Sequence, residues 1–166
     1  TNGRLYHNSG GTSGQLGNLR LSAEGPAGFS RPGTLSGFAS AAGMLELARK
    51  RYPQHWESGA DLFQVIRDAQ NGDPFAQEIF AEAGAQLGQG LAGLVHLLQP
   101  DLIIIGFPGC LLEEQLLKPA RAALAAATEL AESALPRLMP SALCARLPEL
   151  EAIVPAIHQS RAQKTE

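Results

Sequence analysis

This sequence has no excess of basic over acidic residues, and it contains only two cysteines. The 13 Lys and Arg residues against 16 Asp and Glu give a net charge of −3. The chain therefore has no basic stripe for a nucleic-acid backbone and no polybasic segment for a membrane surface. Cys110 and Cys144 have neither metal-ligand spacing nor the density of a disulfide framework, which favours a reducing compartment and a cytoplasmic location. A small molecule or another protein is the expected partner.

Long hydrophobic runs are also lacking. No apolar stretch reaches the roughly 20 residues that a membrane-spanning helix needs. Thr1 to Arg4 does not resemble the start of a signal peptide, and the sequence begins without Met, in what reads as the middle of a strand or hairpin. We therefore expect residues 1–166 to be a single lobe of a larger protein.

The stretch from Leu87 to Gly109 has the strongest structural signals in the chain, and the other segments are interpreted around it. It predicts the end of a long helix with one apolar face, then a turn, then a buried strand from Leu102 to Ile105. The strand is apolar on both faces, as in a sheet covered by helices on each side. Ligands collect at the carboxyl ends of such strands, which directs attention to Gly106–Gly109. Four small residues of the helix leave room for a neighbouring backbone: Gly84, Gly88, Ala92 and Gly93.

The other segments predict an α/β fold in which helix is dominant. The expected helices are Ser36–Arg51, Gly59–Asn71, Asp73–Leu98, Lys118–Ala134 and Ala152–Arg161, with one turn at Leu112–Leu117. The expected short strands are Arg4–Tyr6, Leu19–Leu21, Leu102–Ile105 and Ala142–Leu147.

Side chains that could carry chemistry are sparse. The loop Gly10–Asn18 has no Walker lysine and is not a GxGxxG opening a helix, so it can be an ordinary hairpin or a ligand loop. Within it, Gln15 and Asn18 can both donate and accept hydrogen bonds, as polyol recognition requires, although turn capping explains them equally. The histidines and aspartates are scattered, and each aspartate has a capping or surface explanation. We predict no catalytic residue and no metal ligand in this chain.

Four blocks of the sequence, in their order and spacing, carry a family resemblance. The blocks are NGRLYHNSGGTSGQLGN (2–18), RPGTLSGFASAAG (31–43), LGQGLAGLVHLLQPDLIIIGFPG (87–109) and LLKPARAAL (116–124). Together they resemble the C-terminal lobe of ROK-family proteins, which are sugar kinases and sugar-responsive repressors. The resemblance implies one lobe of an actin-like ATPase (ribonuclease H-like) fold, helix-rich with a short mixed sheet.

The resemblance assigns sugar contacts to Gln15, Asn18 and Ser36. Family members typically have Glu, His and Glu at these places, so neutral polar groups replace ionisable ones here. Charge-assisted hydrogen bonds are roughly twice as strong as neutral ones, so we expect weaker hexose binding or a different ligand. Many members also have a cysteine-rich zinc motif. This chain has Ala27 and Phe29 where two of its cysteines fall, and we predict no zinc.

The resemblance also implies a nucleotide site, and it implies that this chain lacks part of the catalytic site. Gly106, Phe107 and Gly109 form the expected adenine-side loop, on the same cleft as the sugar residues. The catalytic aspartate of ROK kinases lies in the other lobe, so this chain alone should not transfer phosphate. The complete protein is expected to phosphorylate a hexose or hexosamine with ATP and Mg²⁺. The alternatives are the sugar-sensing, dimerising lobe of a repressor, and a non-catalytic piece; a homodimer is expected, without direct nucleic-acid binding by this lobe.

Overall fold

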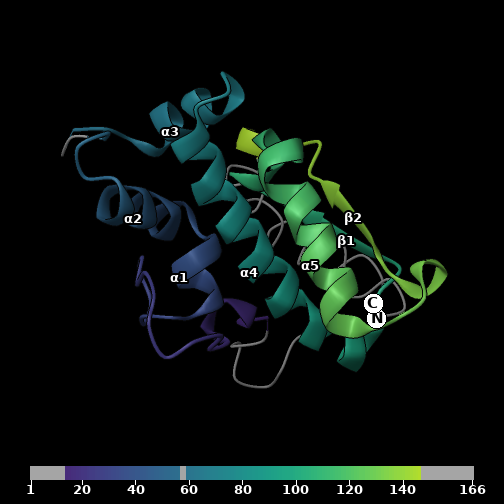
Figure 1. Cartoon of the computed structure of the whole chain (residues 1–166). Helices are drawn as coiled ribbons and strands as arrows, with labels where there is room; N and C mark the ends of the chain where they lie inside the picture. Colours follow the sequence, from purple (N-terminus) through teal and green to yellow (C-terminus); the bar gives the residue numbers. More distant parts are fainter. Residues whose placement is uncertain (1–13, 57–58, 147–166) are drawn as a thin grey trace, which may run out of the picture.

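The computed structural model of the chain describes residues 14–56 and 59–146. Within these ranges, helices surround a central helix and cover one face of a short parallel sheet (Figure 1). The helices are α1 (Leu35–Ala39), α2 (Ala41–Arg51), α3 (Leu62–Gln70), α4 (Pro74–Leu98) and α5 (Lys118–Thr128). The strands are β1 (Leu102–Ile105) and β2 (Arg137–Pro140). The short 3₁₀ or π turns are η1 (Leu16–Asn18), η2 (Gly109–Leu111), η3 (Glu113–Leu117), η4 (Glu132–Ala134) and η5 (Cys144–Arg146). The expected segments Arg4–Tyr6 and Ala152–Arg161 lie outside the described residues.

Helix α4 runs through the middle of the molecule, with α1, α2 and α3 on one side and α5 on the other (Figure 1). The Asp73 carboxylate caps its first turn by accepting a hydrogen bond from the Ala76 backbone N–H at 2.8 Å, and Pro74 follows at the first helical position. The helix ends at Leu98, and the next residue, Gln99, has a left-handed backbone conformation with a φ of 43°. The predicted start and end of this helix are confirmed.

The small residues of α4 allow the following chain to pack against its backbone. A Cβ at Gly84 would lie 2.3 Å from the Leu116 carbonyl oxygen, and one at Gly88 would lie 2.3 Å from the Ala120 carbonyl oxygen. The expected close approach is therefore confirmed at both glycines, where η3 and α5 pass. It is wrong at Gly93, where a Cβ would meet no atom within 4 Å.

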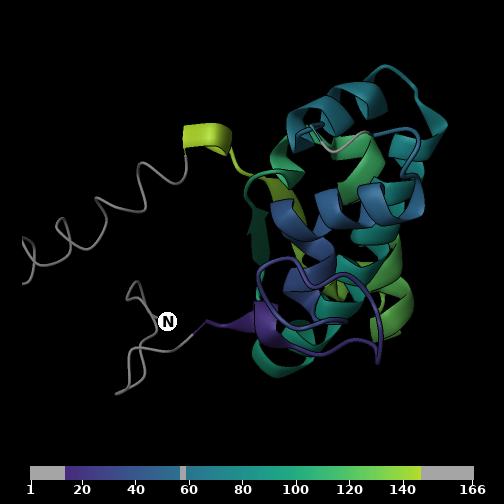
Figure 2. The same cartoon turned by 90° about the vertical axis from the view of Figure 1, so that its left-hand side faces the viewer.

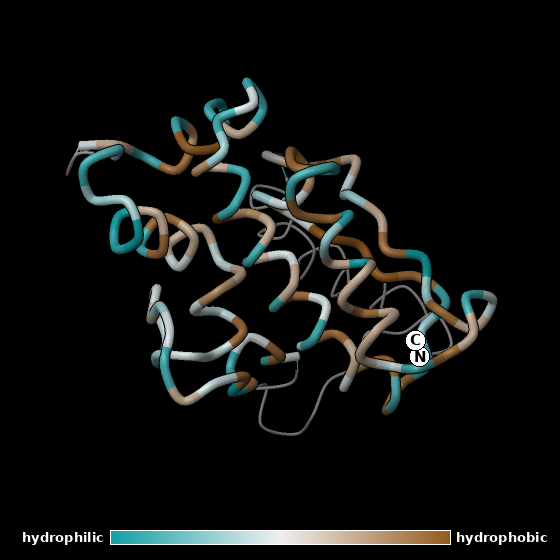
Figure 3. The backbone as a smooth tube through the Cα atoms, in the orientation of Figure 1, coloured by the Kyte–Doolittle hydropathy of each residue, from teal (hydrophilic) through white to brown (hydrophobic). Residues whose placement is uncertain are grey.

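The two strands pair in parallel, from Leu102 opposite Arg137 to Ile105 opposite Pro140. Both α4 and α5 cover the same face of this sheet, where Leu138 is buried, and the strands lie behind these helices in Figure 1. On the other face, Leu102 and Ile104 are 44% and 61% exposed. Within the described residues, the expectation of helices on both faces is therefore wrong. Strand β1 is strongly hydrophobic along its length, as Figure 3 shows.

Two expected helices differ from the observed ones. The helix expected at Ser36–Arg51 is interrupted at Ser40, which is extended and caps α2 by accepting from the Gly43 N–H at 3.1 Å. The helix expected from Lys118 to Ala134 ends at Thr128, because Glu129 has a φ of 54°. The sequence after it forms η4 and then β2.

The expected strand at Ala142–Leu147 is also wrong. Its described part contains η5, and the strand lies earlier, at Arg137–Pro140. Between two prolines this short run has no strand signature, and it becomes a strand by pairing with β1. The pairing continues past β2, because the Ser141 N–H donates to the Ile105 carbonyl oxygen at 2.8 Å. None of the described helices is both long enough and apolar enough to cross a bilayer.

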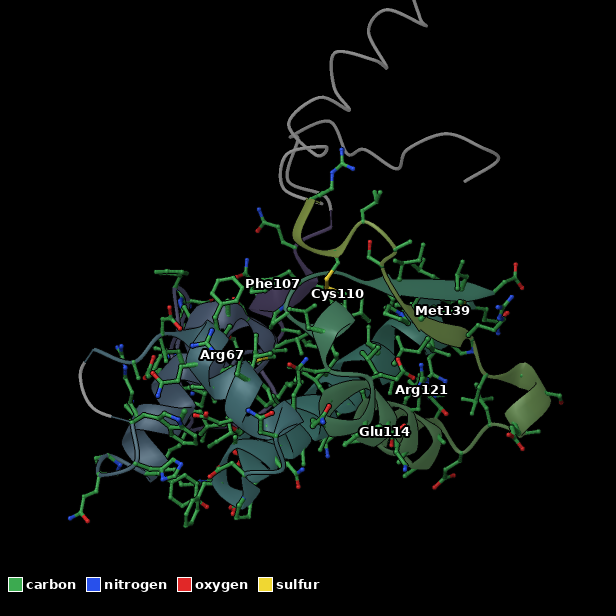
Figure 4. All side chains as sticks on the ribbon, turned by 90° about the horizontal axis from the view of Figure 1, so that it is seen from above. Arg67, Phe107, Cys110, Glu114, Arg121 and Met139 are labelled. Atoms are coloured by element: carbon green, nitrogen blue, oxygen red, sulfur yellow. A yellow bond between two sulfur atoms is a disulfide. The ribbon has the colours of Figure 1, made fainter. Side chains whose placement is uncertain are left out.

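A disulfide joins Cys110 and Cys144, with 5.5 Å between their Cα atoms, and Figure 4 shows the bond beside the Cys110 label. The expectation of two reduced cysteines is therefore wrong. The two parallel strands end side by side, so the segments that follow them, η2 and η5, come together. The two cysteines are 34 residues apart in sequence, and that spacing alone gives no sign of the contact.

Reduction of this disulfide should lower the free energy of unfolding. A cross-link that closes a loop of this size stabilises by about 3 to 4 kcal/mol in the chain-entropy model. Urea unfolding with and without dithiothreitol measures the change. The double variant C110S/C144S should match the reduced protein and be insensitive to dithiothreitol. Equal stability of the oxidised and reduced protein would contradict the role of the bond.

Substitutions of two glycines in α4 should have opposite effects. Gly88→Ala places a methyl group against the α5 backbone and should destabilise by about 1 to 3 kcal/mol. Gly93→Ala is exposed and meets no neighbour, so better helix propensity should stabilise by about 0.5 to 1 kcal/mol. Thermal unfolding of the two variants tests the packing, and a Gly88→Ala variant as stable as Gly93→Ala would refute it.

Candidate functional site

The turn η1 and helix α1 bring the predicted sugar residues together. A Cβ at Gly17 would lie 3.2 Å from the Ser36 Cβ, so the turn lies against the start of the helix. Within the turn, the Asn18 side-chain amide donates to the Gln15 Oε1 at 2.9 Å. Gln15, Asn18 and Ser36 therefore share one small region, although Ser36 follows Gln15 and Asn18 only after the loop that Arg20 and Thr34 close.

Backbone hydrogen bonds hold this region in place. The Leu35 N–H donates to the Leu19 carbonyl oxygen at 2.8 Å, and Arg20 and Thr34 form an isolated antiparallel bridge. Gly33 closes the intervening loop with a φ of 71°, and a Cβ there would lie 2.3 Å from the Ser22 carbonyl oxygen. A side chain at this position would be strained and crowded, so the Arg31-Pro32-Gly33 turn depends on glycine.

A hollow of about 510 Å³ lies beside Asn18 and is lined by Asn18, Ser30, Arg31 and Thr34. The Ser30 hydroxyl lies 3.5 Å from the Asn18 Oδ1, as a long hydrogen-bond donor. Thr34 is buried; its hydroxyl donates to the Arg31 carbonyl oxygen at 2.8 Å and accepts from the Gly37 N–H at 3.1 Å. Sequence reasoning missed Ser30, Arg31 and Thr34 as lining residues. Their segment has the sequence of a turn, and it lies beside η1 only because Thr34 pairs with Arg20.

Glu46 of α2 holds the part of this loop that precedes Ser30. Its Oε2 accepts from the Gly28 N–H at 2.8 Å and from the Ala27 N–H at 3.2 Å, while its Oε1 lies 2.6 Å from the Lys50 Nζ. The Lys50 ammonium, followed by the two N–H groups, lowers the pKa of the Glu46 carboxyl despite its partial burial. The positions where zinc ligands would fall therefore have other roles or none: Ala27 donates to Glu46, and Phe29 is 94% exposed.

The loop after β1 lies on the same side of the molecule as η1. Figure 2 shows η1 and β1 on one side, and Figure 4 shows Phe107 and Cys110 toward that side. The half-buried Phe107 ring lies 5.4 Å from the Phe63 ring of α3, and Pro108 follows a cis peptide bond. Gly109 is buried, and a Cβ there would lie 2.5 Å from the Ile105 Cγ2, so packing explains this glycine.

The loop does not line the hollow beside Asn18. The structure thus places the two predicted loops on one face without bringing their side chains into one pocket wall. The nucleotide roles of Gly106, Phe107 and Gly109 and the sugar roles of Gln15, Asn18 and Ser36 stay predictions.

Other ionisable groups have structural partners. Asp61 and Asp73 cap α3 and α4, and Asp68 accepts from the Trp56 indole N–H at 3.0 Å. The His55 Nε2 lies 3.1 Å from the Asp73 carboxylate. Within residues 14–56 and 59–146, no group of three His, Cys, Asp or Glu is placed to hold a metal ion.

The stability that Glu46 contributes should depend on pH. Its pKa in the folded state lies below the unfolded value of about 4.5. The contribution is therefore complete above that pH and is lost as the pH falls through the folded pKa. Glu46→Gln should cost about 1 kcal/mol at pH 7 and much less at pH 3.

Glu114→Gln is the matched control, because Glu114 pairs with Lys118 at the same helical spacing but both side chains are highly exposed. It should change stability by less than about 0.5 kcal/mol at either pH. Thermal unfolding at the two pH values measures both variants. An equal loss for both at pH 7 would show that the backbone contacts of Glu46 contribute nothing.

Known proteins resemble the chain in sequence and in fold. A family model described as the ROK family matches residues 1–140. The glucokinase of Halalkalibacterium halodurans is 29% identical over 132 residues, which cover 72% of this chain and 40% of that protein. The DNA-binding transcriptional repressor Mlc of Escherichia coli is 32% identical over 114 residues, which cover 65% of this chain and 28% of that protein.

A solved structure of similar fold is the ROK family glucokinase from Streptomyces griseus in complex with glucose and AMPPNP. It matches with a TM-score of 0.64 at 23% identity, over 78% of this chain and 46% of that chain. The chain thus spans less than half the length of these relatives. The likeness shows the helix-rich, actin-like ATPase fold of ROK sugar kinases. Because the family model covers residues 1–140 of the 166, the chain belongs to the ROK family.

Proposed function

We propose that this chain forms the sugar-facing wall of a ROK-type sugar kinase or kinase-like protein. The observation that carries the proposal is the polar cluster at η1, where Asn18 is hydrogen-bonded to Gln15 and lies within 3.5 Å of the Ser30 hydroxyl. Ser36 lies against the same turn. In the full-length protein the proposed reaction is the ATP-dependent phosphorylation of a hexose or hexosamine.

The chemistry of this cluster suits a ligand with many hydroxyl groups. Amide and hydroxyl side chains can each donate and accept, and Gln15 and Asn18 are exposed at the surface of the turn. Their mutual hydrogen bond fixes the two amides before a ligand arrives, which reduces the entropy lost on binding. The antiparallel bridge between Arg20 and Thr34 and the contacts of Glu46 with Ala27 and Gly28 hold the loop that carries Ser30 and Arg31.

Phosphoryl transfer needs groups that we assign to the rest of the full-length protein. The chain covers 40% of the length of the similar glucokinase, and Asp61, Asp68 and Asp73 have capping or side-chain hydrogen bonds that explain them structurally. Bound ATP with Mg²⁺ would supply the phosphoryl group and neutralise its charge. The half-buried Gly106 and Phe107, on the same face as η1, would form an edge of the nucleotide site.

A sugar-sensing repressor is the second candidate. The similarity to Mlc supports it, since that repressor shares 32% identity over 114 residues with this chain. The rest of the full-length sequence separates the two: a phosphate-binding DxGxT strand and an Asn-Asp pair favour a kinase, whereas a helix-turn-helix favours a repressor.

Asn18→Ala should weaken sugar binding by the full-length protein. The variant removes one hydrogen-bonding amide and frees Gln15, so we expect an affinity about 10-fold lower. Calorimetric titration with a panel of hexoses and hexosamines measures the change. Gln64→Ala, an exposed amide truncation on α3, is the control and should bind as the natural protein does. No heat with any sugar would overturn the proposed function, and equal affinity of Asn18→Ala would remove Asn18 from the site.

A further inference from the structure

Arg31 carries an unpaired positive charge at the hollow beside Asn18. Its side chain is exposed, and among residues 14–56 and 59–146 no hydrogen bond or ion pair engages its guanidinium. Other arginines are engaged: Arg121 pairs with Glu113, and Arg20 donates to the carbonyl oxygens of Ser22 and Ala23. The charge of Arg31 is therefore available to a ligand.

The other described residues that line the hollow, Asn18, Ser30 and Thr34, are neutral, and most of their polar atoms are occupied. The Thr34 hydroxyl is used twice, once as donor and once as acceptor. The Asn18 amide gives its N–H to Gln15, and its oxygen faces the Ser30 hydroxyl. The strongest donor left free at this place is the Arg31 guanidinium.

An anion would meet little opposing negative charge here. Among the residues that the structure describes, no carboxylate lines the hollow, and Gln15 and Ser36 beside it are uncharged. The carboxylate of Glu46, on the far side of the loop, is neutralised by Lys50 and by the N–H groups of Ala27 and Gly28. A guanidinium binds a carboxylate or phosphate through two parallel N–H donors, and a hollow of about 510 Å³ has the size of a small-molecule site.

We propose that this hollow selects an anionic sugar, a sugar acid or a sugar phosphate, and that Arg31 binds its charged group. The proposal rests on the proposed function, because it takes the sugar ring to contact the amides of η1. It also explains why Gln15 and Ser36 are neutral where family members typically have Glu, because carboxylates at these positions would repel an anionic ligand.

Calorimetry on the full-length protein tests the proposal with three probes that share one ring: glucose, glucuronate and glucose 6-phosphate. We expect at least one anionic probe to bind about 10-fold more tightly than glucose, and to weaken as salt is raised. Arg31→Gln should remove this preference, so that the affinities for glucuronate and glucose 6-phosphate fall to that for glucose. Arg31→Lys keeps the charge without the planar fork and should retain only part of the preference.

Arg67→Gln is the matched control, because it removes the same charge from the exposed surface of α3, and Arg67 does not line the hollow beside Asn18. It should leave all three affinities unchanged. Tighter binding of glucuronate identifies a sugar acid, and tighter binding of glucose 6-phosphate identifies a phosphate ester. Glucose binding equal to that of both anions, or an anion preference that survives in Arg31→Gln, overturns this inference but leaves the proposed function intact. Absence of binding by all three probes and by the wider sugar panel overturns both.

Discussion

The contact between the backbones at Gly84 and Gly88 determines how the described part of the molecule is arranged. Carbonyl oxygens of Leu116 and Ala120 lie where side chains of α4 would otherwise stand, so η3 and α5 lie directly on that helix. This placement carries β2 back to β1 as a parallel neighbour and puts both helices on one face of the sheet. The loop after β1 and the turn η1 then reach the same side of the molecule (Figures 2 and 4).

The candidate site depends on a different kind of restraint. Its loop is held by polar contacts: the Arg20–Thr34 bridge joins the two ends of the loop, and the Glu46 carboxylate holds its middle at Ala27 and Gly28. A buried threonine caps α1 between them. Such polar contacts hold side chains in fixed positions and leave the space beside them open. A packed apolar cluster would fill that space. The hollow and its polar rim follow from this arrangement.

Local signals in the sequence predicted the elements that need no distant partner. The Asp73-Pro74 pair and the apolar run of β1 fixed the limits of α4 and β1 correctly, because capping and strand propensity act within a few residues. The strand β2 was missed, since a short run between prolines becomes a strand only when it pairs with β1. The disulfide was missed for the same reason. At the site, the family resemblance pointed to Gln15, Asn18 and Ser36, whereas Arg31 stood in a segment that reads only as a turn.

The bond between Cys110 and Cys144 closes a covalent ring in the chain. That ring contains η3, α5, η4 and β2, which is most of the return path from one strand to the next. A protease that cuts once inside the ring would therefore leave both products tethered, and they would separate on a gel only after the sulfurs are reduced. The segment that completes the sheet thus remains attached even after its peptide backbone has been broken.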